Sequence, residues 1–462
     1  MAAIITNKFR IHNAEQFYES FSEAAASTYY LFVGRPQAFS TTTGGGTDIS
    51  VPTPVDNIDD EYMYWRDALA AKKVASTDVS YVVPRINWTV GDTYAKYRHD
   101  YSSTNQAYGS KNTLWDASFY VMTSEYKVYK CMNNNGAQPV TTGNEPDHVT
   151  NVEAETGDGY MWKYMYTMTT SQVQNFLSTD FMPVATDSTV SGAAVDGEIR
   201  HAFIDTAGTG YTNSTYTGVP IRGDGSGGTV DLVVSGNVVT SATVTAPGTG
   251  YTHAYINVDA VSSIGGNADA VVTPIVGPKE GHGNDALKEL GAFYVMMNTS
   301  LSGAEGSGDF IVDNDFRRVA LVRNPYNYGT TTVSTAATLG ALRSVTFAAS
   351  PTPGTFIVDE IITGQTSGAK GEVVAWDSTN RILKYIQTEW GGIDSNKNIT
   401  AFAGTEVVQG SSSLSPTGTI ASGGITNPEI AYHSGDIMYV ENRAPIVRAS
   451  DQTENIKLVI EF

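Results

Sequence analysis

Cysteine is almost absent from this sequence. Cys131 is the only one among 462 residues, so no disulfide can form within the chain. A single thiol also excludes every zinc site that is built from several cysteines. Cys131 lies in the run Tyr126–Met132, whose composition predicts a buried thiol on a strand. We therefore expect packing alone to stabilise the fold.

Positive charge is scarce. The chain has 28 Lys and Arg against 48 Asp and Glu, which gives a net charge of −20 at pH 7. This balance repels phosphate backbones and anionic lipids, so we expect neither a nucleic-acid nor a membrane partner. Solubility alone can explain the acidity, and so can complementarity to basic partner subunits. The sequence leaves both interpretations open.

Long apolar runs are also missing. No stretch approaches the roughly 18 apolar residues of a membrane-spanning helix. Residues 1–10 lack the basic region and the long apolar region that together form a secretory signal. We expect the chain to be made and folded in a reducing cytoplasm.

The usual signatures of catalysis do not occur. The sequence contains neither GxxxxGK[ST] nor GxSxG, which removes the common phosphate cradle and the nucleophile elbow. The seven histidines form no HExxH motif and no pair at helical metal-ligand spacing; they are His12, His99, His148, His201, His253, His282 and His433. Loop hydrogen bonding is the predicted role of His282 and His433. We therefore expect no catalytic, cofactor-binding or metal-binding residue, no cofactor and no enzyme.

Two weaker patterns suggest sites but have simpler interpretations. The segment Arg222–Gly228 matches GxGxxG and contains RGD, but it precedes the strand-like run 229–234 instead of opening a helix, which favours a turn. Paired acids that are able in principle to hydrolyse glycosides occur at Asp59–Glu61, at Asp359 with Glu360, and at Glu155 with Asp158. Negative charge at a helix start explains the first group, and turns explain Asp158.

The abundant residues favour strands and turns. Glycine occurs 45 times and tyrosine 26 times. We predict only two helices near the start. One runs from Asn13 to Ala26. The other follows the cap region Asn57–Asp60, carries Tyr62, Trp65 and Leu69 on one face, and has Lys72 and Lys73 near its end. Strands are predicted at Tyr29–Val33, Tyr81–Val83, Phe119–Met122, Phe293–Met297, Arg318–Val322 and Ile456–Phe462. The predicted fold class is mostly β, a multi-domain β-sandwich frame with a few short helices and two inserted small β domains.

Two internal repeats locate the inserted domains. The hexapeptide at 207–212 (AGTGYT) recurs at 247–252 (PGTGYT), and the segment 356–364 (FIVDEIITG) is echoed at 402–410 (FAGTEVVQG). Each pair indicates a duplicated strand–turn unit. We therefore predict one small β module at 196–279 and another at 345–422. The remaining frame, 1–195 with 280–344 and 423–462, is expected to form two sandwich-like subdomains with the N- and C-terminal pieces together.

One aromatic row stands out within the predicted frame. Tyr160, Trp162, Tyr164 and Tyr166 alternate along a predicted strand and so share one of its faces. Such a row either fills a sandwich core or forms an exposed surface that binds sugars or proteins. The sequence does not decide between these two interpretations.

Several short motifs resemble one known family in their order along the chain. They are AIITNKFR at 3–10, FVGR at 32–35, VPRINW at 83–88, GDGYMW at 157–162, HSGD at 433–436, VENRAP at 440–445 and DQTEN at 451–455. In this order they resemble the baseplate wedge subunits of T4-like contractile-tailed bacteriophages, the family of the dimeric wedge protein encoded by T4 gene eight. The resemblance covers about 1–195 and 425–462, and more weakly 280–330. The motif residues to which it assigns a structural role are Arg35, Pro84, Arg85, Trp88, Gly157, Asp158, Gly159, His433, Gly435, Glu441, Asn442, Arg443, Pro445, Asp451 and Gln452.

The resemblance implies a structural protein of the virion rather than an enzyme. It implies a homodimer in the tail baseplate, assembled in the host cytoplasm, which bridges other wedge subunits during assembly and during the conformational change on infection. The two extra modules are expected to contact tail fibre or peripheral baseplate proteins. The alternative is a β-rich receptor- or carbohydrate-binding tail protein that uses the aromatic row and the paired acids.

Overall fold

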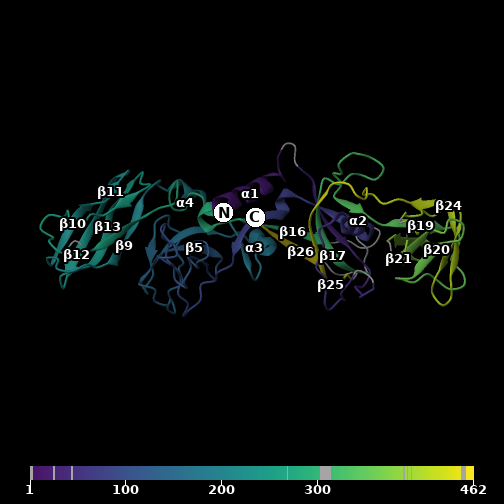
Figure 1. Ribbon diagram of the computed structural model, residues 1–462, viewed down its shortest axis with the longest axis horizontal. Helices are drawn as coiled ribbons and strands as arrows, with labels where there is room; N and C mark the ends of the chain where they lie inside the picture. The colour runs from purple at the N-terminus through teal and green to yellow at the C-terminus, as the bar shows by residue number, and fades with distance from the viewer. Residues whose placement is uncertain are drawn as a thin grey trace. The chain divides into compact units, whose positions relative to one another are not determined.

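The chain folds into two compact units. The computed structural model describes residues 4–23, 27–42, 45–267, 269–301, 314–388, 391–392, 394–396, 398–448 and 454–462. Unit 1 consists of Met1–Gln16, Ser80–Met296 and Val459–Phe462, and unit 2 of Phe17–Val79 and Met297–Leu458 (Figure 1). Strands dominate both units, so the prediction of a mostly β, multi-domain chain with a few short helices is confirmed. The ends of the chain both belong to unit 1.

Unit 1 is built on a four-stranded sheet with the order β4–β5–β7–β6. Its strands are β4 (Tyr120–Met122), β5 (Lys127–Asn134), β6 (Ala154–Glu155) and β7 (Tyr160–Thr167). A second sheet has the order β26–β16–β3–β8. These strands are β3 (Val79–Pro84), β8 (Phe181–Pro183), β16 (Tyr294–Leu301) and β26 (Glu454–Glu461). The short helices are α3 (Thr170–Phe176), α4 (Ser188–Gly192) and α5 (Ala286–Leu290).

The aromatic row of β7 lies in the core of unit 1. Tyr160, Trp162, Tyr164 and Tyr166 are all at most 4% exposed, and Tyr160 stacks on Trp162 with ring centroids 5.4 Å apart. Lys163 and Met165, on the other face of β7, are buried as well. The row therefore presents no free surface to a sugar or a partner. Cys131 is buried on the neighbouring strand β5, as predicted.

The segment of the first predicted module forms three small sheets in unit 1. Their orders are β15–β9, β10–β12–β13 and β11–β14. The strands are β9 (Ile199–Thr206), β10 (Ser214–Pro220), β11 (Arg222–Gly223), β12 (Ser226–Ser235), β13 (Val238–Thr249), β14 (Ala254–Tyr255) and β15 (Val271–Val276). The two copies of the GTGYT repeat have matching backbones: φ is 67° and 77° at Gly208 and Gly210, and 61° and 72° at Gly248 and Gly250. The Tyr of each copy, Tyr211 and Tyr251, is buried in one shared core.

Unit 2 is built on a five-stranded antiparallel sheet with the order β18–β2–β1–β17–β25. Its strands are β1 (Tyr29–Gly34), β2 (Ala68–Val74), β17 (Asn314–Arg323), β18 (Thr338–Gly340) and β25 (Asp436–Arg448). Every residue of β1 is buried, because β1 pairs on both sides and carries large apolar side chains. Between β2 and β3 lies the 3-10 helix η1 (Ser76–Asp78).

The second predicted module falls on a closed six-stranded barrel in unit 2. The order around the barrel is β19–β22–β21–β20–β23–β24, and β24 returns to β19. Its strands are β19 (Arg343–Phe347), β20 (Ile361–Gly364), β21 (Lys370–Asp377), β22 (Ile382–Ile386), β23 (Val407–Gly410) and β24 (Thr417–Thr426). Because the barrel is closed, it has no unpaired edge strand that could pair with another chain.

The sequence echo at 356–364 and 402–410 corresponds to a local two-fold symmetry of the barrel. Strands β20 and β23 pair antiparallel about Thr363 and Gln409, which hold the same position in the two copies. On either side, Gly371 packs against Tyr385 of β22, and Gly418 packs against Phe347 of β19. In the second half of the barrel, β19 therefore occupies the position that β22 occupies in the first half.

Both helix predictions need correction. Helix α1 spans Asn7–Glu19, six residues earlier than the predicted start at Asn13, because the Thr6 carbonyl and hydroxyl accept the first amide hydrogen bonds. The predicted end, residues 24–26, lies outside the described residues.

Helix α2 spans Ile58–Arg66 and begins at the predicted Asn57 cap, but Leu69 and the lysines after it belong to β2 rather than to the helix. Tertiary strand pairing with β1 overrides the helix propensity of the alanine-rich segment 68–71.

Candidate functional site

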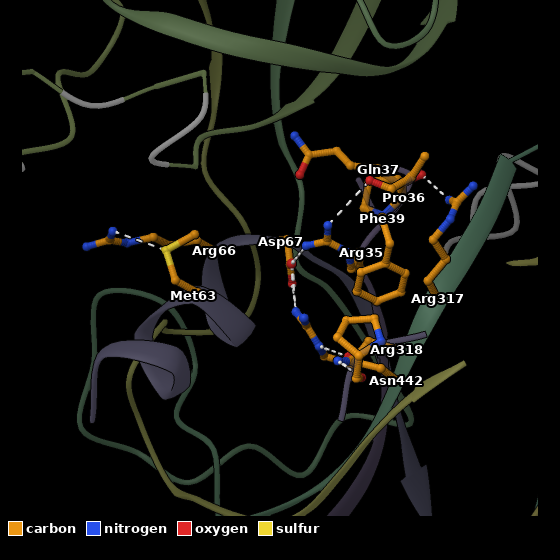
Figure 2. A network of polar contacts seen from close by, with 12 residues as sticks. Arg35, Pro36, Gln37, Phe39, Met63, Arg66, Asp67, Arg317, Arg318 and Asn442 are labelled. Atoms are coloured by element: carbon orange, nitrogen blue, oxygen red, sulfur yellow. Dashed lines mark hydrogen bonds and ion pairs between the residues drawn. The ribbon is translucent and has the colours of Figure 1, made fainter. Parts of the chain in front are cut away.

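The most constrained site in unit 2 is a set of buried charged residues around Asp67, which we call the Asp67 network. Asp67 ends helix α2 and is completely buried, with an exposed fraction of 0%. Nη1 of Arg318, on β17, lies 2.6 Å from each carboxylate oxygen of Asp67. Nη1 of Arg35 lies 3.8 Å from the same carboxylate. Figure 2 shows Asp67 between the two arginines.

Arg35 is placed by an unusual backbone conformation. It follows β1 with φ of 56°, in the left-handed region that few residues other than glycine adopt. Its amide donates to the Asp67 carbonyl over 2.8 Å, and its carbonyl accepts from the Arg317 amide over 3.1 Å. The guanidinium group packs over the Phe39 ring at 4.1 Å. A Cβ at Gly34 would lie 3.0 Å from the Asp67 carbonyl, so this close approach favours glycine before Arg35.

The C-terminal motif reaches the same network. Asn442 lies opposite Arg318 in the β17–β25 pairing and accepts a hydrogen bond from Arg318 Nε over 3.0 Å. Its amide nitrogen donates to the Pro52 carbonyl over 3.0 Å. The FVGR motif near the start and the VENRAP motif near the end therefore meet at one buried cluster. Two of the motif residues, Arg35 and Asn442, are part of it.

The electrostatics of the Asp67 network are those of a structural site. Burial raises the pKa of Asp67, against the attraction of Arg318 and Arg35, and lowers the pKa of Arg35 to about 10. The next strand residue, Arg317, forms a separate set of contacts with Asp48 at 2.9 and 3.0 Å and with Asp315 at 2.7 Å. Buried charges that are paired in this way, such as Asp67 with Arg318, orient the elements that carry them.

Unit 1 holds a second buried charged cluster. Lys130 Nζ on β5 bonds to the Glu289 carboxylate and lies 2.7 Å from His282 Nδ1, and all three side chains are at most 3% exposed. Burial, followed by the nearby Lys130 charge, lowers the pKa of His282 well below its usual range, so the ring is neutral and accepts from Lys130. The structure thus pairs His282 with an amine, whereas the sequence predicted hydrogen bonding within a loop.

The remaining motif residues lie in turns and on exposed strand positions. In the turn before β7, Asp158 accepts from Thr141 N over 3.0 Å and from Thr156 Oγ1 over 2.7 Å. Arg85 Nη1 donates to the Ser178 carbonyl over 2.9 Å, and the Trp88 amide donates to Met122.

The glycine pair of the same turn, Gly157 and Gly159, lies against the side chains of Asn144 and Asn135, which leaves no room for a Cβ.

The named residues of the two C-terminal motifs are half-buried or exposed. Gly435 has φ of 72° and lies against the Arg323 carbonyl, and the His433 ring meets Tyr62 edge-to-face at 4.4 Å. Glu441 pairs with Arg443 over 3.3 Å. Pro84 and Pro445 are exposed. Asp451 and Gln452 lie outside the described residues.

Sequence reasoning missed Asp67 and Arg318, the centre of the Asp67 network. The available signal was weak: two adjacent arginines directly before the apolar run 319–322, and one aspartate before an alanine-rich strand. Charges in such positions are almost never buried unless they are paired. Neither residue belongs to a motif on which the resemblance rests.

The described residues hold no group of three or more His, Cys, Asp or Glu that could bind a metal ion. Among them, no helix has the length and apolar character needed to cross a membrane. Unit 1 also contains a cleft of about 720 Å³, lined by Tyr97, Tyr101, Trp115 and charged side chains of both signs.

Comparison with known proteins agrees with the motifs. The family described as Phage-Gp8: Bacteriophage T4, Gp8 has a model that matches residues 3–145. No curated protein matches the chain. The matched range contains Arg35, Asp67 and Lys130, so it includes residues of both buried clusters. Over residues 3–145 the chain is therefore similar to the family of the T4 gene 8 baseplate wedge protein, and this similarity supports the resemblance that the motifs indicate.

Proposed function

We propose that this chain bridges neighbouring wedge proteins during baseplate assembly and takes part in the conformational change of the baseplate on infection. It acts through its interfaces and performs no chemistry of its own. The observation that carries this proposal is the Asp67 network, which joins motif residues 407 positions apart, Arg35 and Asn442, in one buried cluster. A protein that transmits force between neighbours needs such rigid connections within each unit.

An exposed apolar surface on unit 1 supports the expected homodimer. Ile4, Ile5 and Phe9 surround the start of α1 and are 86%, 71% and 54% exposed. Neighbouring exposed apolar side chains of this kind are typical of protein interfaces. In an isologous dimer the same surface is used twice, and the dimer then presents two identical faces to its neighbours.

The net charge of −20 supports basic neighbouring subunits as partners. We assign the contacts with tail fibre or peripheral baseplate proteins to the modules 196–279 and 345–422. Assembly would take place in the host cytoplasm before the baseplate joins the tail. The buried aromatic row takes no part in these contacts, because its four side chains are inside the core.

Light scattering tests the proposal. The purified chain should have the mass of a dimer and should enter a larger, defined complex when mixed with the other wedge proteins of the same phage. The triple change Ile4→Asp, Ile5→Asp and Phe9→Asp should give a folded monomer. Ile49→Asp is the matched control, because Ile49 is fully exposed at 100% and lies elsewhere, in unit 2. A wild-type monomer that ignores the other wedge proteins would contradict the proposal.

A further inference from the structure

Two neighbouring hollows on the module 196–279 share the residues Pro220 and Arg222. One has a volume of about 710 Å³ and is lined by the glycine-rich segment 223–228 with His253 and Tyr255. The other has a volume of about 400 Å³ and is lined by Thr215, Tyr216, Thr217 and Asn257 among others. We call the two together the Arg222 groove. Sites of this size are typical of small ligands.

Arg222 is unusual in its surroundings. It is the only Lys or Arg between positions 201 and 278, a segment that contains five aspartates. Its side chain is exposed and forms no ion pair with any residue that the structure describes. The groove therefore carries one unpaired positive charge on the surface of an acidic chain.

The nearest acid does not neutralise Arg222. The Asp224 carboxylate accepts from Thr252 N over 2.9 Å, from His253 N over 3.0 Å and from the Thr252 hydroxyl. These hydrogen bonds hold the pKa of Asp224 well below its usual range. They also hold the aspartate of the RGD sequence against the backbone of Thr252 and His253.

An aromatic ring lies directly across from the cation. Arg222 on β11 pairs with Tyr255 on β14, and both side chains are exposed, Tyr255 to 48%. Residues opposite each other on an antiparallel pair have Cβ atoms about 5 Å apart and point to the same face. The His253 ring follows at 6.3 Å from the Tyr255 ring.

We propose that the Arg222 groove binds an acidic saccharide, a sugar that carries a carboxylate or a phosphate. Tyr255 would stack on the apolar face of a sugar ring, and Arg222 would pair with the anionic group. The hydroxyl and amide groups of Thr215, Thr217 and Asn257 would take the hydroxyls of a neighbouring sugar. A single cation on a chain of charge −20 does not suit a nucleic acid or an anionic membrane, because these need several cations.

Matched pairs of sugars test this proposal on the full-length protein. The pairs are trigalacturonic acid and its methyl ester, sialyllactose and lactose, and mannose 6-phosphate and mannose. Binding is measured by calorimetry, and the carboxylate and phosphate members show which anion is preferred. We expect at least one acidic member to bind at least tenfold more tightly than its neutral counterpart. Binding to none of the three acids, or equal binding within every pair, would overturn the proposal.

Variants then locate the site. Arg222→Gln should abolish the preference for the acidic member, and Tyr255→Ala should weaken binding of the acidic member at least tenfold. Matched controls are Lys370→Ala, an exposed cation on the barrel, and Tyr328→Ala, an exposed tyrosine at 42% in unit 2. Both controls should bind as the wild type does, and circular dichroism should show that all four variants are folded. Unchanged binding in Arg222→Gln would place the sugar elsewhere and overturn the proposal.

Discussion

The carboxylate of Glu406 lies 2.6 Å from the position that a Cβ on Gly364 would occupy. It accepts from the amides of Thr366 and Ser367, just after Gly364, over 3.0 and 2.8 Å. Its counterpart in the other repeat, Glu360, lies against Gly410 in the same way and accepts from the Ser412 amide over 2.9 Å. Each half of the barrel thus supplies the carboxylate that caps a turn of the other half.

This exchange predicts two similar losses of stability. Gly364→Ala and Gly410→Ala should each lower the free energy of unfolding by about 1–3 kcal/mol. In each variant the added methyl group displaces a buried glutamate carboxylate from the backbone amides that donate to it. Chemical denaturation measures the change. The control is Gly192→Ala on α4, where nothing lies within 4 Å of the added Cβ. Losses that differ strongly between the two barrel variants would contradict the symmetric role of the glutamates.

The Asp67 network predicts a large cost for removing one partner. Asp67→Ala should destabilise the protein by about 3–5 kcal/mol, since it leaves Arg318 and Arg35 buried near an empty site. Arg323 and Asp436 provide the control: they pair at 2.8 Å between β17 and β25 but are 41% and 60% exposed. Asp436→Ala should therefore cost at most about 1 kcal/mol. Equal costs in the two denaturation curves would show that burial does not strengthen the Asp67 network.

Glu372 predicts a loss of stability toward neutral pH. The Gln37 amide bonds to this carboxyl group on β21, and burial raises its pKa to about 7. The folded state therefore holds the proton more tightly than the unfolded state, whose pKa is near the usual 4.5. The stabilisation is complete below about pH 4.5 and disappears as the pH rises through 7. Urea unfolding of the wild type and of Glu372→Gln at pH 5 and 8 should show that the substitution removes this difference.

His282 predicts the opposite trend in unit 1. Its folded pKa is well below the usual 6.5, so the unfolded chain takes up a proton that the folded chain rejects. This contribution is complete above pH 6.5 and is lost as the pH falls. His282→Gln should flatten the decline in stability between pH 7.5 and 5.5 in the same assay. An unchanged slope would mean that His282 accepts a proton without leaving Lys130.

Deleting 345–422 tests whether the barrel is independent of the rest of unit 2. Replacing these residues by a short Gly/Ser linker should leave a soluble dimer. The hydrogen bonds that the deletion removes include one from Gln37 to Glu372 and one from the side-chain amide of Asn314 to the Val374 carbonyl over 2.6 Å. Light scattering and circular dichroism report the outcome. An insoluble product would show that the barrel belongs to the core of unit 2.

Local signals in the sequence predicted local structure well. The Asn57 cap was recognised because its side chain is placed to accept from the amide three residues later, and the structure has this bond at 2.9 Å. The end of the same helix was wrong because Leu69 and its neighbours are determined by pairing with β1 and β18, which are distant in sequence. Helical periodicity in a short segment carries no information about such partners.

The candidate site shows the same division. Motif order led to Arg35 and Asn442, but Asp67 and Arg318, which connect them, became apparent only when β17 was placed between β1 and β25. The repeats at 356 and 402 indicated a duplication, whereas closure of the barrel depends on β19, which precedes both copies. Which face of the aromatic strand is buried depends on the surrounding sheets, and the strand's own sequence does not specify them. In the structure both faces of β7 lie in the core.

The barrel begins and ends at one place, since Ser344 and Thr426 pair directly across β19 and β24. Neighbouring strands are about 5 Å apart. The 83 residues of the barrel therefore separate the two ends of the surrounding chain by no more than a tight turn would. A coding segment with this property can be gained, lost or moved to another loop by a single recombination event without disturbing the recipient fold. The barrel is in this sense a self-contained insert, which a phage could exchange between different proteins of its particle.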